Sequence, residues 1–174
     1  MVVIVTGVSG AGKTTVGQAL AARLHWMFED GDDWQPMSNI EKMRSGHALT
    51  DEDRAPWIQS LNAAIRKWME EVQDVVLACS ALKGSYREAL RAGVKNSQGV
   101  QFVYLKGSYA LISQRLRQRR GSGHFMPESL LRSQFEALQE PTASEAYIVD
   151  ADKPLETIVE ETIAGVKLKA RASR

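Results

Sequence analysis

Short apolar runs recur along this chain and alternate with longer segments in which apolar residues return every three or four positions. The runs predict buried β-strands over residues 1–6, 25–29, 75–79, 100–105 and 146–149. Strands that alternate with helices form a parallel sheet covered on both faces, joined by right-handed crossovers. The pattern therefore predicts an α/β fold built on a five-stranded parallel sheet.

The segments between the runs predict helices with identifiable starts. Ser38-Asn39-Ile40-Glu41 fits a capping box, and Thr50 precedes three acids that favour a helix N-terminus. The helix after Thr50 carries an apolar stripe that we expect to be mostly core: Trp57, Leu61, Ile65, Trp68 and Val72. The other helices are expected over residues 15–24, 39–45, 85–92, 108–119 and 127–138, and from Pro154 onward.

Composition and charge bound the class of protein without identifying a ligand. The chain has 174 residues, of which 44% are hydrophobic and 25% charged, and its net charge is +1. These values predict one globular domain over residues 1–174, and the near-neutral charge provides no bulk field to recruit nucleic acid or an anionic membrane. Cys79 is the only cysteine, and neither a signal peptide nor a membrane-length apolar run is visible, so we expect a cytoplasmic protein.

The strongest chemical signal lies between the first strand and the first helix. Residues 7–14 fit Gly-x-x-x-x-Gly-Lys-[Ser/Thr], a loop whose backbone N–H groups surround phosphate oxygens at a helix N-terminus. Lys13 is expected to reach the β- and γ-phosphates, and the Thr14 hydroxyl to hold Mg²⁺. The flanking strand and helix disfavour the alternative of a ligand-free glycine-rich turn. The expected nucleotide-binding residues are Gly7, Val8, Ser9, Gly10, Ala11, Gly12, Lys13, Thr14 and Thr15.

Acidic residues follow the second predicted strand, at the sheet edge where open α/β folds bind ligands. Asp30-Gly31-Asp32-Asp33 places three carboxylates in four residues. Because the third strand ends in Cys79-Ser80 without a carboxylate, we assign Asp30 to the Mg²⁺ shell, through water. Asp32 is then the group that orients or deprotonates an acceptor hydroxyl. The alternative is a solvated acidic turn, which is less expected beside a phosphate loop.

Arginines crowd the end of the helix that Ser108 begins. Arg115, Arg117, Arg119 and Arg120 precede the break Gly121-Ser122-Gly123. One interpretation is a set of favourable cations at a solvated helix C-terminus. The other is a helical lid over residues 119–138, which closes over ATP and places arginines on the transferring phosphoryl group.

A second group of cations follows the acidic turn. Lys42, Arg44 and Arg54 either form surface ion pairs, which contribute little, or clamp an anionic group on the acceptor, and the residues alone leave both open. We expect the Cys79 thiol to be packed at the end of its strand rather than to act as a nucleophile. His124, in the predicted lid, is a candidate for a phosphate contact, but a lone loop histidine is more often only exposed.

Longer segments resemble the small, bacterial-type gluconokinase family over nearly the whole chain. The most specific matches are the run from Asn39 to Trp57 and the segment Cys79-Ser80-Ala81-Leu82-Lys83. Further matches are Tyr104-Leu105-Lys106-Gly107, Gly123-His124-Phe125, Ser133-Gln134-Phe135 and Val149-Asp150 followed by Pro154. The family's lid pattern is similar to Arg-x-Gly-His-Phe, whereas two extra residues follow Arg119 here, which leaves open which arginine corresponds to it.

The resemblance implies a single-domain P-loop kinase, similar in fold to shikimate and adenylate kinases. It implies phosphorylation of the C6 hydroxyl of D-gluconate by ATP with Mg²⁺, and a homodimer. The expected catalytic residues are Lys13, Asp32 and Arg119, and the metal ligands are Thr14 and Asp30. Arg115 and Pro154 join the phosphate loop at the nucleotide. The expected acceptor-binding residues are Asp32, Lys42, Arg54, Lys83 and His124.

Three other functions compete with this expectation. A kinase for shikimate or another sugar acid fits the acid and arginine pattern but not the family segments. A nucleotide-binding switch is disfavoured because the sequence lacks the Asp-x-x-Gly and Asn-Lys-x-Asp motifs of switch GTPases. A nucleic-acid phosphotransferase is disfavoured by the net charge of +1 and by the lack of a basic, aromatic run.

Overall fold

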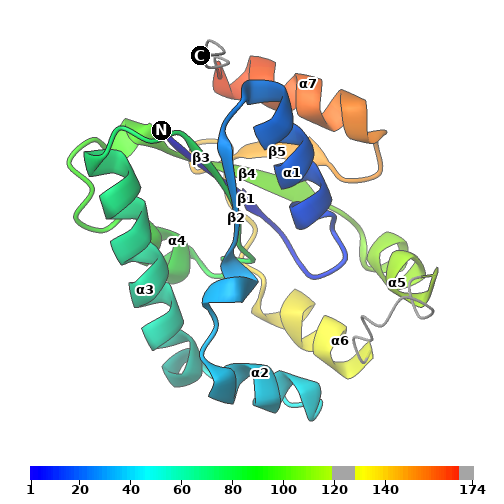
Figure 1. The fold of residues 1–174 in the computed structure, drawn as a ribbon. Coiled ribbons are helices and arrows are strands. Elements are labelled where there is room, and N and C mark those ends of the chain that lie inside the picture. Colours follow the sequence, from blue (N-terminus) through cyan, green and yellow to red (C-terminus); the bar gives the residue numbers. More distant parts are fainter. Residues whose placement is uncertain (119–127, 169–174) are drawn as a thin grey trace.

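A computed structural model describes residues 1–118 and 128–168 of the chain. The strands are β1 (Val2–Thr6), β2 (Met27–Asp30), β3 (Val75–Ala78), β4 (Val100–Lys106) and β5 (Tyr147–Asp150). The helices are α1 (Lys13–Leu24), η1 (Gly31–Trp34), α2 (Met37–Arg44), α3 (Asp51–Glu70), α4 (Gly84–Arg91), η2 (Ser97–Gly99), α5 (Tyr109–Gln118), α6 (Glu128–Ala137) and α7 (Leu155–Val166). Figure 1 shows their arrangement.

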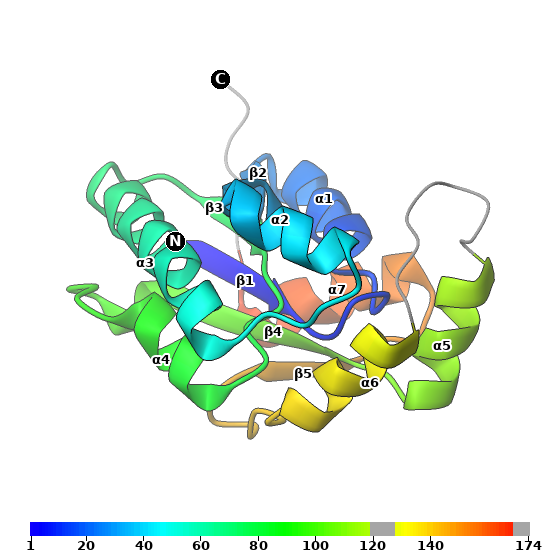
Figure 2. The same cartoon turned by 90° about the horizontal axis from the view of Figure 1, so that it is seen from below.

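The strands form one parallel sheet in the order β2-β3-β1-β4-β5, with helices on both faces (Figures 1 and 2). Successive β1 side chains alternate between the faces: Val3 and Val5 pack with α1 and α7, whereas Val2 and Ile4 pack with α3 and α4. Because both faces are covered, every residue of β1 is buried. The prediction of a five-stranded parallel α/β fold is confirmed. None of the helices in the described part of the chain is long and apolar enough to cross a membrane.

The long helix α3 confirms most of the predicted apolar stripe and corrects its end. Trp57, Leu61, Ile65 and Trp68 are buried against the sheet. Val72 was predicted to continue the stripe, but it is 75% exposed and lies beyond the helix. There the chain reverses: Val72 adopts a left-handed φ of 54° and the N–H of Gln73 donates to the carbonyl of Trp68 at 2.8 Å. The reversal leads the backbone into β3 and turns Val72 outward.

Two other predicted boundaries are wrong for similar local reasons. The second strand begins at Met27 rather than at His25, because His25 takes a left-handed φ of 55° and ends α1. Helix α2 begins at Met37 after Pro36, so Ser38 lies inside the first turn and is not its cap. The predicted cap at Thr50 is confirmed, since Thr50 and Asp53 form a capping box. The predicted helix start at Pro127 lies outside the described residues.

The contrast between Leu61 and Val72 gives a stability prediction. Leu61 is fully buried between α3 and the sheet, so Leu61→Ala should lower the free energy of unfolding by about 2–5 kcal/mol. Val72→Ala, at an exposed position, should change it by no more than about 0.5 kcal/mol. Urea unfolding of both variants measures the difference, and equal losses would show that the stripe does extend to Val72.

Candidate active site

Three loops meet at the carboxyl-terminal edge of the sheet. They follow β1, β2 and β3, and they carry the phosphate loop, the acidic turn and the segment from Cys79 to Lys83. Strand β1 pairs with both β3 and β4, so the phosphate loop emerges where the strand order reverses, the usual ligand crevice of open α/β sheets. The Thr6 hydroxyl donates to the Ser80 carbonyl and ties the first and third loops together.

The phosphate loop has the backbone that the motif predicts. Gly12 stands at the N-cap of α1 with a left-handed φ of 102°, a conformation that side chains rarely adopt. Gly7 has a φ of 147°, and a Cβ there would lie 3.0 Å from the carbonyl oxygen of Leu105. The Lys13 ammonium donates to the carbonyl of Val8 at 3.2 Å, folding the side chain back over the loop. The loop is therefore shaped with its single cation directed inward.

Thr14 and Asp30 lie side by side, as the metal assignment requires. The Thr14 hydroxyl donates to Oδ2 of Asp30 at 2.8 Å, and Oδ1 of the same carboxylate accepts from the N–H of Asp32 at 3.1 Å. The indole of Trp57 donates to the Gly31 carbonyl at 2.7 Å from the buried side of the turn. A Cβ on Gly31 would lie only 2.8 Å from the Ala78 carbonyl, so the turn packs directly on the end of β3.

Lys13 and Asp32 perturb each other's ionisation. Burial lowers the pKa of Lys13, and the negative charges of Asp32 and Asp30 oppose this. Asp32 is open to solvent on one side, but the surrounding protein still desolvates it and raises the pKa of its carboxyl group, against the pull of Lys13. Burial also raises the pKa of Cys79 to about 12, so its thiol stays protonated and the prediction of an unreactive, packed cysteine agrees with its place in the core.

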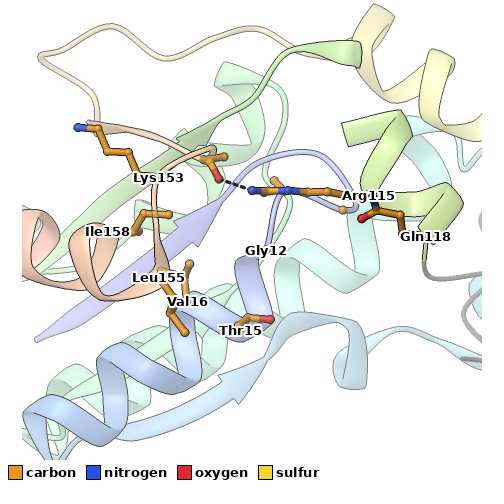
Figure 3. Close-up of a pocket in the computed structure, with 11 residues that line it drawn as sticks. Gly12, Thr15, Val16, Arg115, Gln118, Lys153, Leu155 and Ile158 are labelled. Carbon is orange, nitrogen blue, oxygen red and sulfur yellow. Dashed lines mark hydrogen bonds between the residues drawn. The ribbon is translucent and has the colours of Figure 1, made fainter. Parts of the chain in front are cut away.

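A cavity of about 350 Å³ adjoins the loop on the side of α5 and α7 (Figure 3). Arg115 reaches it from α5 and donates to the Ala151 carbonyl at 2.7 Å, while Leu155 and Ile158 of α7 line the opposite wall. Pro154 is the N-cap of α7, directly before this wall. Six lining residues carry no motif and were not predicted from the sequence: Val16, Gln118, Ala151, Lys153, Leu155 and Ile158.

The acceptor-side cations already have acidic partners. Lys83 donates to both oxygens of Asp51 at 2.7 Å, and the Tyr86 hydroxyl donates to the same carboxylate. Arg54 donates to the Leu49 carbonyl at 2.6 Å and lies 4.0 Å from Asp51. The structure thus brings Lys83 and Arg54 together around Asp51, which sequence reasoning had not selected.

Lys42 lies apart from this group and bonds to Asp53 at 2.6 Å. Arg44, the weaker candidate, is exposed on α2. The lid candidates Arg119 and His124 lie outside the described residues, as does the break at residues 121–123. Sequence reasoning quoted Gln134 only as part of a matching segment, yet its side chain hydrogen-bonds to Ser9 of the phosphate loop.

Comparisons with known proteins identify relatives that cover most of this chain. A family model described as an AAA domain matches residues 2–161. The thermoresistant gluconokinase of Escherichia coli K12 is 45% identical over 166 residues, covering 94% of this chain and 92% of the relative. The gluconokinase of Gluconobacter oxydans is 44% identical over 161 residues, covering 92% and 88%.

Two solved kinase structures share the fold of this chain. A gluconokinase from Sinorhizobium meliloti superposes with a TM-score of 0.82 at 43% identity, covering 95% of this chain and 90% of that one. A shikimate kinase from Aquifex aeolicus superposes with a TM-score of 0.61 at 19% identity, covering 96% of each chain, and so shares the fold alone.

Asp53 gives a prediction about acid stability. The bond from Lys42 and the N–H of Thr50 stabilise its carboxylate and lower its pKa to about 2, from an ordinary value of 3.8. A lowered pKa stabilises the fold above the ordinary value, and this contribution is lost as the pH falls toward 2. The melting temperature of Asp53→Asn should therefore lie below that of the wild type at pH 6, and the gap should close on acidification.

Glu52→Gln, an exposed change in the same helical turn, is the matched control for charge alone and should follow the wild type. A gap between Asp53→Asn and the wild type that stays constant down to pH 2 would contradict the linkage.

Proposed function

The chain belongs to the gluconokinase family, and we propose that it transfers the γ-phosphoryl group of ATP to the C6 hydroxyl of D-gluconate, yielding 6-phospho-D-gluconate and ADP. One observation carries the proposal. The phosphate loop meets Asp30 and Asp32 at one sheet edge in a chain 45% identical to a gluconokinase over nearly its whole length. Phosphoryl transfer depends on positioning and charge neutralisation, which this edge is built to supply.

Thr14 and Asp30 are the proposed Mg²⁺ site. A hydroxyl and a carboxylate 2.8 Å apart beside the phosphate loop are hard oxygen donors of the kind that Mg²⁺ prefers, and they would hold the ion together with water and phosphate oxygens. When bound, the ion neutralises charge on the phosphate oxygens. The hydrogen bond between Thr14 and Asp30 holds the two donors beside each other.

Lys13 and Asp32 are proposed to act at the two ends of the transfer. Lys13 neutralises the charge that develops on the phosphoryl group. Asp32 orients the acceptor hydroxyl and accepts its proton, and a carboxylate whose pKa is raised by desolvation is a stronger base than an ordinary one. Because the ionised form is required, turnover falls as the pH drops through this raised pKa.

The remaining ligand contacts follow from the same arrangement. Arg115 and the cavity beside α7 are proposed to hold the nucleoside, and residues 119–138, with Arg119 and His124, to form the lid, whose C-terminal part stays attached to the phosphate loop through Gln134. Arg54, Lys83 and Lys42 are proposed to hold the gluconate carboxylate. Ion pairs that are open to solvent contribute little stability, so a substrate carboxylate can take over cations that Asp51 and Asp53 hold in the free protein.

We also propose that the protein works as a homodimer in the cytoplasm, without a nucleic-acid partner. The dimer is what the resemblance in sequence implies, and the net charge of +1 is consistent with a small-molecule substrate.

A coupled ADP-release assay tests the function directly. D-gluconate, other aldonates, shikimate and nucleoside monophosphates are offered at equal concentrations, with Lys13→Ala as the inactive control. We expect D-gluconate to give the highest kcat/KM and Lys13→Ala to remain folded but nearly inactive. A preference for shikimate or a nucleotide, or near-normal turnover by Lys13→Ala, would refute the proposal.

The two aspartates should separate by what they change. Asp32→Asn should lower kcat by about 10²–10⁴-fold with little effect on the KM for ATP, because it removes the group at the acceptor hydroxyl. Asp30→Asn should instead raise the Mg²⁺ concentration needed for half-maximal rate, because it removes a metal ligand. Titrating Mg²⁺ at saturating substrates measures both, and the opposite pattern would show that the two roles are exchanged.

Arg54 is expected to affect the binding of gluconate but not the binding of ATP. A charge-assisted bond to the substrate carboxylate is worth about 1.5–3 kcal/mol, so Arg54→Ala should raise the KM for gluconate by roughly 10–150-fold and leave the KM for ATP unchanged. Arg44→Ala, which removes an exposed cation from α2, is the matched control and should behave as the wild type. An Arg54→Ala protein with a lower melting temperature and normal gluconate kinetics would assign Arg54 to the Leu49 and Asp51 contacts only.

A further inference from the structure

One side chain of helix α6, that of Gln134, hydrogen-bonds to the phosphate loop. The N–H of Ser9 donates to Oε1 of Gln134 at 2.7 Å, and Nε2 of Gln134 donates to Oγ of Ser9 at 3.1 Å. The two residues are 125 positions apart in the chain. Both atoms of the Gln134 amide are therefore used to hold one residue of the phosphate loop.

The segment leaving α6 contacts the second ligand loop. The N–H of Gln139 donates to the Leu82 carbonyl at 2.9 Å, and the N–H of Gly84 donates to Oε1 of Gln139 at 2.8 Å. Gly84 is the first residue of α4, and among the described residues its N-cap, Lys83, makes no side-chain capping bond. Gln139 thus caps α4 from outside, at the residue directly after Lys83.

Arg87 strengthens the same junction. Its buried guanidinium donates from Nη1 to the carbonyls of Ala81 and Leu82, each at 3.3 Å, and to the carbonyl of Gln139 at 3.0 Å. Ala81 has a left-handed φ of 38°, which costs energy for a residue with a Cβ and persists only when the surroundings impose it. The shape of the turn before Lys83 therefore depends on the segment that leaves α6.

We propose that the C-terminal end of α6, together with the segment that leaves it, is a strut that positions both halves of the active site, with Gln134 and Gln139 as its two positioning residues. Gln134 acts through Ser9 on the nucleotide, and Gln139 acts through Gly84 and Lys83 on the acceptor. The proposal rests on the function proposed above. The two residues lie five positions apart, near and just beyond the C-terminal end of α6, but they bond to different loops, so each contact can be removed while the other remains.

The nucleotide half is tested without any acceptor. Gln134→Met keeps the length of the side chain and the helix propensity but removes both hydrogen bonds. The Kd for MgADP, measured by calorimetry, should rise at least about fivefold, because a phosphate loop that Gln134 no longer holds must be ordered when the nucleotide binds. Ser9→Ala removes only the bond to Oγ and should give a smaller increase. The KM for gluconate should stay within about twofold of the wild type in both variants.

The acceptor half is tested by a matched pair at one position. Gln139→Met removes the cap on Gly84 and should raise the KM for gluconate by about two- to tenfold, while the Kd for MgADP stays unchanged. Gln139→Glu keeps an oxygen that accepts from the Gly84 N–H, so it should restore the wild-type KM. Gln59→Met, an exposed glutamine on α3, is the control for the substitution itself and should change neither constant.

The split between the two constants decides the outcome. The strut is supported if Gln134→Met raises only the Kd for MgADP and Gln139→Met raises only the KM for gluconate. Two results would overturn the proposal: a lower melting temperature with both constants unchanged, or a weaker binding of the same ligand in both variants. A helix with a merely structural role would not separate the two subsites. Wild-type protein without gluconate-dependent ADP release would instead refute the proposed function, and the MgADP arm would still decide whether Gln134 positions the phosphate loop.

Discussion

The place of β1 in the sheet is the constraint on which the rest of this structure depends. Because β1 pairs with β3 on one side and β4 on the other, its carboxyl-terminal end opens into the one crevice that the strand order creates. The loop leaving that strand must start α1 within a few residues and still direct N–H groups inward, which requires left-handed glycines such as Gly12. The acidic turn after β2 reaches the same crevice, one strand beyond β3.

The crevice holds charged groups in surroundings that disfavour their charged forms. Desolvation pushes Lys13 and Asp32 toward their neutral forms, and each is kept charged in part by the other. On the acceptor side the cations are satisfied by Asp51 and Asp53, which are partly open to water. The cations of the site are therefore paired with carboxylates when no ligand is bound, which avoids the cost of unpaired charges. A sugar acid that binds would replace these carboxylates as the partner of the cations.

The loops of the crevice take much of their shape from contacts between residues that are distant in sequence. Trp57 holds the Gly31 carbonyl from α3, Arg87 holds the turn at Ala81 from α4, and Gln134 holds Ser9 from α6. Such loops gain their order from the packed elements beneath them. This arrangement gives helices outside the site a direct effect on where ligand-binding groups lie.

The sequence by itself determined the fold class, the phosphate loop and the acids at the sheet edge. These depend on periodicity and on short motifs, so neighbouring residues suffice to predict them: β1, Thr14, Asp30 and Asp32 all follow from local patterns. The tertiary structure decided where His25, Ser38 and Val72 fall relative to the ends of their elements, because left-handed turns and a proline cap override the pattern there.

The tertiary structure also decided that Asp51 pairs with both Lys83 and Arg54, and that Gln134 hydrogen-bonds to Ser9, 125 positions away in the chain. A hydrogen bond depends on distance in space, and no local pattern encodes which residues the folded chain brings together.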